Sequence, residues 1–124
     1  MKHGLSKTVI LAQLEYIRTL KQEHFICMSI GSNLHVIAYH TVFIGTLDSV
    51  MANPREIFAA AIADHAWEII VAHNHPSGDA KPSEQDIATT KQLAAAGAIL
   101  GIPLRDHIIV TTDKYFSFWS KGLL

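Results

Sequence analysis

The stretch VAHNHPSGDAKPSEQD, residues 71–86, joins the end of an apolar run to two closely spaced histidines and the start of a helix. His73 and His75 are separated by one residue, and Asp86 follows further along the same stretch. Side chains two positions apart in an extended chain lie on the same side of it. Both imidazoles can therefore face one point, while Asn74 between them points elsewhere, toward backbone groups.

The segments on either side of this stretch have clear local signals. The continuous apolar run IIVAH, residues 69–73, predicts a buried strand. Ser83 is a candidate N-cap with Asp86 three residues later, and the following residues 84–100 predict a helix. The two histidines thus lie between the end of a buried strand and the start of a helix, where α/β folds place their ligands.

The other segments complete an α/β pattern. Asn53 and Pro54 are a typical N-cap and first helical residue. In chain order, we expect a helix over 6–20, a hairpin of strands over 24–30 and 35–44, a helix over 53–68, and a closing hairpin over 106–112 and 115–120. This order predicts an α/β sheet with helices packed on it.

Composition limits the classes of protein to consider. The 124 residues suit one domain, and an apolar fraction of 49% with 17% charged residues is globular. The net charge of −1, without a basic stripe, predicts no direct nucleic-acid binding. A single cysteine, Cys27, excludes a disulfide framework and favours a cytoplasmic location. No apolar run approaches the roughly 18 residues of a membrane span, so we expect no membrane association.

The combination of two imidazoles and one carboxylate suits a catalytic zinc ion. Catalytic Zn²⁺ is typically held by three protein ligands and keeps its fourth position open. His73, His75 and Asp86 could supply such a set. A histidine pair alone is a weak signal, but the pair combined with Pro76, Ser83 and Asp86 at these offsets is far more specific.

The stretch HNHPSGDAKPSEQD resembles the H-x-H, seven residues, S-x-x-D core of the JAMM/MPN metallopeptidases. It is most similar to the RadC-type branch, which the flanking stretches GTLD (45–48), ANPREIFAAAIADHA (52–66), LGIPLRDHIIV (100–110) and SFWSKGLL (117–124) also resemble. The resemblance runs from about Glu23 to the end of the chain. It implies a single JAB/MPN domain over residues 1–124, with a mixed β-sheet flanked by helices and an architecture like that of cytidine deaminases.

The resemblance also implies a role for each matching residue. His73, His75 and Asp86 match the zinc ligands, and the Ser83 hydroxyl matches the group that supports the developing oxyanion. Glu23, just before the first strand, matches the glutamate that takes a proton from the zinc-activated water and passes it to the leaving amine. The implied activity is hydrolysis of a peptide or isopeptide bond in a peptide or protein substrate.

Each of these residues also has a simpler interpretation. Ser83 is explained equally well as a helix N-cap, and both roles can hold at once. Asp86 could merely favour the helix start as a negative charge, but the histidine pair at matching offsets favours the ligand role. Glu23 could be a solvated residue at a helix–strand junction. His107, beside Asp106, could line the edge of the site, but the sequence gives no reason to include it.

The N-terminal part and the function leave alternatives open. Residues 1–22 predict one helix leading into the domain, without the helix-hairpin-helix region usual in RadC-type proteins, so the chain is either a short form or a fragment. The alternative function is a non-catalytic metal-binding or protein-interaction module associated with DNA repair or mobile elements. A homo-oligomer is compatible with either function.

Overall fold

The computed structural model describes residues 5–45 and 53–124. Most of the stretch GTLD, and residues 1–4 ahead of the predicted N-terminal helix, therefore lie outside the described residues. In chain order the elements are α1 (Lys7–Gln13), the 3₁₀ turn η1 (Glu15–Ile17), β1 (His24–Ile30), β2 (Val36–Ile44), α2 (Pro54–Ala63), β3 (Glu68–Asn74), α3 (Glu84–Leu100), β4 (Leu104–Val110) and β5 (Tyr115–Ser117). None of the helices in these two ranges is long and apolar enough to cross a membrane.

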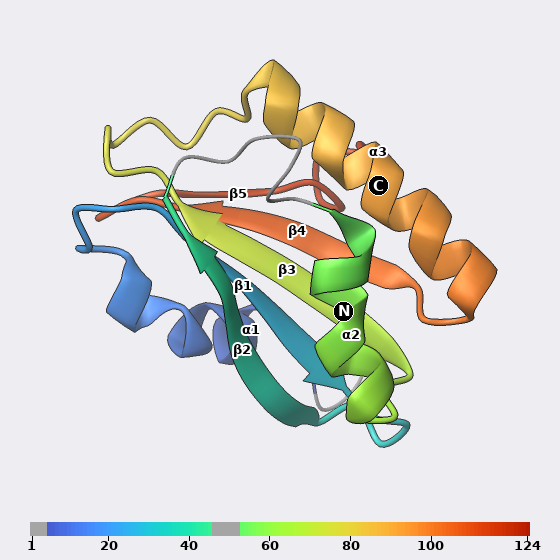
Figure 1. Cartoon of the computed structure of the whole chain (residues 1–124). Coiled ribbons are helices and arrows are strands. Elements are labelled where there is room, and N and C mark those ends of the chain that lie inside the picture. The colour runs from blue at the N-terminus through green and yellow to red at the C-terminus, as the bar shows by residue number, and fades with distance from the viewer. Residues whose placement is uncertain (1–4, 46–52) are drawn as a thin grey trace.

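The strands form one mixed sheet in the order β2-β1-β3-β4-β5. β1 runs antiparallel to both β2 and β3, and β5 runs antiparallel to β4. β3 and β4 are parallel, and α3 makes the crossover between them. The predicted mixed α/β sheet with both hairpins is confirmed, and the crossover places the start of α3 beside the carboxyl end of β3 (Figure 1).

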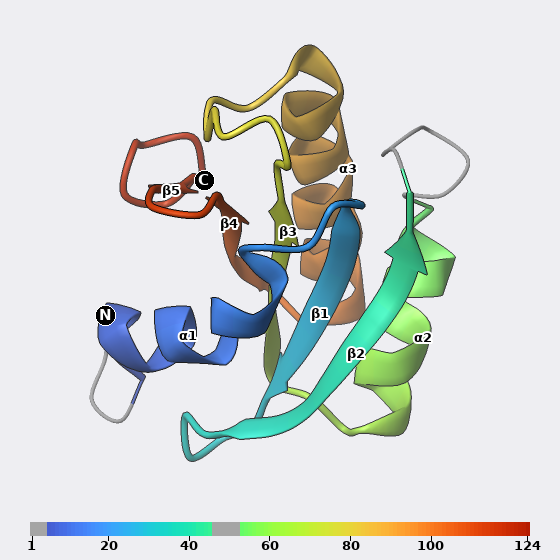
Figure 2. The same cartoon turned by 90° about the vertical axis from the view of Figure 1, so that its left-hand side faces the viewer.

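Helices cover both faces of the sheet. Figure 2 shows α1 on one side and α2 and α3 on the other. Alternate residues of the central strands supply the two cores. One core packs against α1 and contains Ile26, Met28, Ile70, Ala72 and Ile108, whereas the other packs against α2 and α3 and contains Phe25, Cys27, Ile69, Val71 and Leu104. By the same alternation His73 faces α3.

The predicted N-terminal helix is shorter than its apolar pattern suggests. Ser6 caps α1 as expected, accepting a hydrogen bond from the Val9 N–H. The helix ends at Gln13, because the Leu14 N–H bonds to the Leu11 carbonyl in a tighter turn that continues into η1. The tightening lets Leu14 and Ile17 be fully buried, while Val9 stays 43% exposed.

The helix predicted over 53–68 ends at Ala63 for a conformational reason. His65 has φ = 54°, a left-handed conformation that stops a right-handed helix. The Ala66 N–H bonds to the Ala61 carbonyl, and the His65 N–H bonds to the Ile62 carbonyl, which together form a Schellman motif. The chain then enters β3 at Glu68.

The helix after the histidine pair has the predicted ends. Ser83 and Asp86 form a reciprocal capping box at its start, and Gly101 with φ = 74° follows its last residue. This start lies directly beyond β3, so the capping box also sets the position of the Asp86 carboxylate relative to the two histidines.

Candidate metal centre

The structure brings His73, His75 and Asp86 together. His73 lies near the end of β3, His75 directly follows that strand, and Asp86 is in the first turn of α3. The Nε2 atom of His73 is 3.2 Å from Asp86 Oδ1, and that of His75 is 3.2 Å from Asp86 Oδ2. The two Nε2 atoms are 3.0 Å apart. The predicted metal-ligand set is therefore a compact cluster able to hold a metal ion.

Burial is uneven across the cluster. The side chains of His73 and Asp86 are only 1% and 2% exposed, whereas that of His75 is 12% exposed. Of these three described side chains, His75 is therefore the one that solvent reaches. The cluster is thus mostly shielded, with His75 as its most exposed member.

The ring orientation of His75 follows from a backbone contact. Its Nδ1 atom is 2.9 Å from the Asp79 carbonyl oxygen, which can only accept a hydrogen bond. Nδ1 therefore carries a proton and donates it. In the neutral ring Nε2 then has a free lone pair directed at the centre.

The donor atoms at the centre fit a divalent metal. Histidine nitrogens and a carboxylate are zinc ligands, and here two ring nitrogens and two carboxylate oxygens converge within a few ångströms. Unprotonated, the ring nitrogens and the carboxylate oxygens would repel one another, so a positive centre, either a proton on Nε2 or a bound metal ion, has to lie among them. The chemistry of the donor set therefore fits Zn²⁺.

The ionisation of Asp86 and His75 reflects the same attraction for positive charge. Burial alone would raise the pKa of Asp86, but its hydrogen bonds with His73 and His75 outweigh burial and hold that pKa far below its usual range. The hydrogen bond to Asp86 is the main reason why the pKa of His75 is raised, with a smaller contribution from the negative charge of Glu23. The carboxylate is therefore ionised and ready to bind a cation.

Aromatic rings surround the inner side of the centre. Phe25 stacks on His73 with ring centroids 5.7 Å apart, and Phe118 stacks on His107 with centroids 4.8 Å apart. Phe25 also meets the edge of His107. This packing excludes water and holds the imidazoles in fixed orientations.

Ser83 lies at the start of α3, beside the Asp86 ligand. Its Oγ accepts a hydrogen bond from the Asp86 N–H at 3.0 Å, and its own N–H donates to Asp86 Oδ2 at 2.8 Å. The N-cap interpretation of Ser83 is therefore confirmed. Its role toward an oxyanion stays a prediction. The cap contact uses Ser83 Oγ as an acceptor, so it does not occupy the hydroxyl proton.

Glu23 precedes β1 on the accessible side of the centre. The β1–β3 register pairs Phe25 with His73, so continuing it places Glu23 opposite His75 and on the same face. The contribution of the Glu23 charge to the pKa of His75 agrees with this position. A hollow of about 340 Å³ between Glu23, Gly45 and Pro76 adjoins this side. The proposed proton shuttle of Glu23 stays a prediction.

Two residues near the centre were not included by sequence reasoning. His107 on β4 is fully buried, and its Nε2 is 2.9 Å from Nδ1 of His73. Thr90 on α3 contacts the other ring nitrogen of His107 at 2.6 Å. Burial lowers the pKa of His107 well below its ordinary value. The sequence feature that could have indicated His107 is its position in an apolar strand, because a buried polar ring needs a hydrogen-bond partner.

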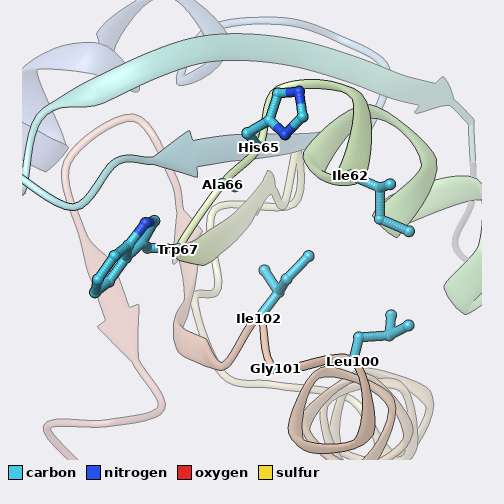
Figure 3. Close-up of a pocket in the computed structure, with 7 residues that line it drawn as sticks. All are labelled: Ile62, His65, Ala66, Trp67, Leu100, Gly101 and Ile102. Atoms are coloured by element: carbon cyan, nitrogen blue, oxygen red, sulfur yellow. The ribbon is translucent and has the colours of Figure 1, made fainter.

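A second hollow, of about 760 Å³, lies far from this centre. It is bounded by Ile62 of α2, Leu100 of α3 and Trp67, which precedes β3 (Figure 3). Trp67 directly precedes β3 and His73 is near the other end of that strand, about 20 Å away by the rise of an extended chain. The lining is apolar apart from His65, so it supplies none of the carboxylates or histidine pairs of the candidate centre.

The fold and the His-His-Asp cluster together define an α/β domain with a candidate metal centre at the carboxyl end of its central strand. The family model described as RadC-like JAB domain matches residues 5–123. The chain therefore belongs to the RadC-like JAB domain family.

Several curated relatives are similar to most of this chain. A UPF0758 protein of Desulforamulus reducens is 46% identical over 111 residues, which are 90% of this chain and 49% of that relative. UPF0758 proteins of Bacillus cereus and Bacillus anthracis are each 46% identical over 109 residues, which are 88% of this chain and 48% of each relative. The chain thus spans about half the length of the curated relatives it matches.

Proposed function

We propose that the chain is a zinc-dependent hydrolase of the JAMM type that cleaves a peptide or isopeptide bond in a protein substrate. The observation that carries this proposal is the convergence of His73 Nε2, His75 Nε2 and the Asp86 carboxylate on one point. The JAB family membership supports the same assignment. The partial exposure of His75 gives a substrate a side from which to approach.

In this proposal His73, His75 and Asp86 hold the metal. When bound, zinc supplies a Lewis acid that makes water acidic near neutral pH and polarises a carbonyl group. The chain's own residues then have to exclude bulk water, orient the substrate carbonyl and move protons. The aromatic packing of Phe25 around His73 serves the first of these tasks.

Glu23 is the proposed general base and acid. Its carboxylate accepts a proton from the attacking water and returns it to the nitrogen of the leaving amine, so no net proton is consumed at the carboxylate. This role requires Glu23 to stay beside His75. Asn74 supports that position because it binds the backbone on both sides of Glu23, at Gln22 and His24.

Ser83 is the proposed donor to the oxyanion. Its Oγ already accepts the Asp86 N–H, which orients the hydroxyl while leaving its proton available. A hydroxyl at a helix start is well placed for this task, since the positive end of the helix dipole favours developing negative charge. Ser83 thus combines the N-cap with a catalytic role.

The proposal is tested by zinc-dependent hydrolysis. Metal is removed from the protein with a chelator and Zn²⁺ is then added back. The protein is incubated with fluorescence-quenched linear peptides and, separately, with peptides joined through a lysine ε-amino group. We expect amine release only after zinc is restored, and cleavage of one of the two substrate sets identifies the bond type. A zinc-loaded, folded chain that releases no amine from either set contradicts the hydrolase and favours the non-catalytic module.

A further inference from the structure

A continuous chain of hydrogen bonds links two of the three candidate ligands through residues of β4 and α3. His73 Nδ1 is 2.9 Å from His107 Nε2, and His107 Nδ1 is 2.6 Å from Thr90 Oγ1. Thr90 Oγ1 in turn donates to the Asp86 backbone carbonyl at 2.8 Å. The path thus begins at the residue that provides the carboxylate and ends at the imidazole ring of His73.

Thr90 determines which group donates and which accepts along this series of hydrogen bonds. The Thr90 hydroxyl has one proton, and that proton is donated to the Asp86 carbonyl, which can only accept. Thr90 Oγ1 must therefore accept from His107, so Nδ1 of His107 carries a proton. Back-bonding of a threonine hydroxyl to the carbonyl four residues earlier is common in helices.

The protonation of His107 in turn determines which ring nitrogen of His73 donates. His107 is fully buried, and its ring nitrogens contact only a hydroxyl and another imidazole, so a second proton would create a buried charge without an acidic partner. His107 Nε2 is consequently an acceptor. His73 donates from Nδ1, so in its neutral ring the lone pair is on Nε2, the atom that faces Asp86 and His75.

We propose that Thr90 and His107 are positioning residues that hold His73 in the tautomer needed to bind a metal through Nε2. The inference rests on the proposed zinc function and deepens it. His75 obtains the same tautomer from the Asp79 carbonyl. Both histidines therefore carry their proton on Nδ1, but for different reasons. A backbone carbonyl accepts that proton from His75, whereas the buried side chains of His107 and Thr90 fix it on His73.

If the hydrogen bonds ran in the opposite direction, His73 would carry its proton on Nε2 and not on Nδ1. If the Thr90 hydroxyl donated to His107, then His107 Nε2 would carry the proton and donate it to His73 Nδ1. The neutral His73 ring would then carry its proton on Nε2, the atom that faces Asp86. Such a proton would have to leave before a metal could bind, so the two directions are distinguishable.

The first test reads the tautomers directly. Long-range ¹H–¹⁵N spectra of the chain with ¹⁵N-labelled histidine are recorded with and without Zn²⁺, above the ordinary histidine pKa of about 6.5. We expect His107 in the Nδ1–H form under both conditions, and His73 with a protonated Nδ1 when Zn²⁺ is bound. His107 in the Nε2–H form overturns the relay. Because His107 is read without metal as well, this result is independent of whether zinc binds.

The second test removes one group from the relay. Thr90→Val keeps the shape of the side chain but leaves His107 Nδ1 without its acceptor, and Thr90→Ser retains the hydroxyl. Thr89→Val is the matched control, since Thr89 is also buried on the same helix and, among the described residues, its hydroxyl accepts from Gln85 and not from the relay. Affinity for Zn²⁺ is measured by competition with a chromophoric chelator.

The outcomes separate the relay from simple packing. We expect Thr90→Val to weaken Zn²⁺ binding by about 10–100-fold, as supporting partners of metal ligands typically do. The tautomer signal of His107 should change in the same variant, and Thr90→Ser should restore both. Unchanged affinity in Thr90→Val, or an equal loss in Thr89→Val, overturns the inference. A wild-type chain that binds no Zn²⁺ contradicts the proposed function instead, while the His107 tautomer still decides the relay.

Discussion

Asn74 Oδ1 accepts the backbone N–H of His24 at 2.7 Å, which ties the end of β3 to the start of β1 beside the candidate centre. The Asn74 amide also donates to the carbonyls of Leu20 and Gln22. Asn74 lies between the two histidines in sequence, yet its side chain points away from them, as expected for a strand. One residue therefore holds the segment that carries Glu23 in place.

Replacing Asn74 should loosen this segment without removing the metal. Asn74→Ala deletes three hydrogen bonds and should lower the free energy of unfolding by about 1–3 kcal/mol. Zinc content should stay close to that of the wild type, while hydrolysis falls because Glu23 is no longer held. Urea denaturation, metal analysis and rate measurements check the three parts. Asn33→Ala is the control, since the exposed Asn33 accepts a local hydrogen bond from the His35 N–H in a turn. An equal loss of rate in that variant contradicts the role of Asn74.

Removal of a ligand should abolish metal binding. We expect the wild type to contain close to one zinc per chain and His75→Ala to lose most of it, because two donors alone do not make a zinc site. Elemental analysis of protein purified without chelator or nickel provides the measurement. His35→Ala, which changes an exposed histidine, should keep its zinc. Equal zinc in the wild type and His75→Ala would falsify the ligand assignment.

Glu23→Gln separates catalysis from metal binding. The amide keeps the size of the side chain but cannot take a proton, so the rate should fall by about 10²–10⁴-fold, as is typical for loss of a general base. Folding and zinc content should be unchanged. Glu15→Gln, at an exposed glutamate paired with Arg18, serves as the control. A Glu23→Gln variant with wild-type activity rules out the proton shuttle.

Asp64 should make stability depend on pH. The hydrogen bonds from His40, foremost, and from Ser29 hold the pKa of Asp64 below its usual value. A lowered folded pKa means that the stabilisation is present above the unfolded value of about 3.9 and is lost as the pH falls through the folded value.

The corresponding experiment compares Asp64→Asn with the wild type in urea. The variant should be less stable by about 0.5–1 kcal/mol at neutral pH, a modest figure because water screens this partly exposed pair. The difference should shrink below pH ~4. Asp113→Asn, which loses only a long contact to Thr111, is the control. A difference that persists unchanged in acid contradicts the assigned cause.

Gly97 should resist replacement by a better helix former. A Cβ atom there would lie 2.5 Å from the Ile102 carbonyl oxygen and 3.2 Å from the Phe58 ring. Helix propensity alone favours Ala over Gly by about 1 kcal/mol, but we expect Gly97→Ala to destabilise the fold by about 1–3 kcal/mol. Thermal or urea unfolding measures this. Ala95→Gly, at an exposed position of the same helix, should cost only the propensity difference; a stabilised Gly97→Ala would show that the backbone approach is not tight.

Local signals in the sequence were sufficient for much of the fold and for the ligand set. The capping pair Ser83 and Asp86 predicted the observed start of α3, because a helix start is specified by residues in direct contact along the chain. The spacing of His73 and His75 predicted two imidazoles on one side, because the period of a strand requires it. The prediction of a mixed sheet rested on the family resemblance together with the order of the helices and strands.

The sequence was less informative where packing overrides local preference. The apolar spacing after Ser6 suggested one helix, but burial of Leu14 and Ile17 against the sheet favoured a tighter turn. Likewise α2 ends early because His65 adopts a left-handed conformation that its residue type does not predict. For α1 a contact with another part of the fold decides the end of the helix, whereas for α2 the local backbone hydrogen bonds around His65 close it.

By itself the sequence determined which residues could bind a metal, since the histidine pair and Asp86 are close together along the chain. Only the tertiary structure decided how these ligands are supported. His107 reaches His73 because β4 lies parallel to β3, and Thr90 reaches His107 because α3 packs over both strands. Strand register and helix packing depend on the whole core, so no local pattern could reveal that a buried histidine and a threonine hold the ring of His73.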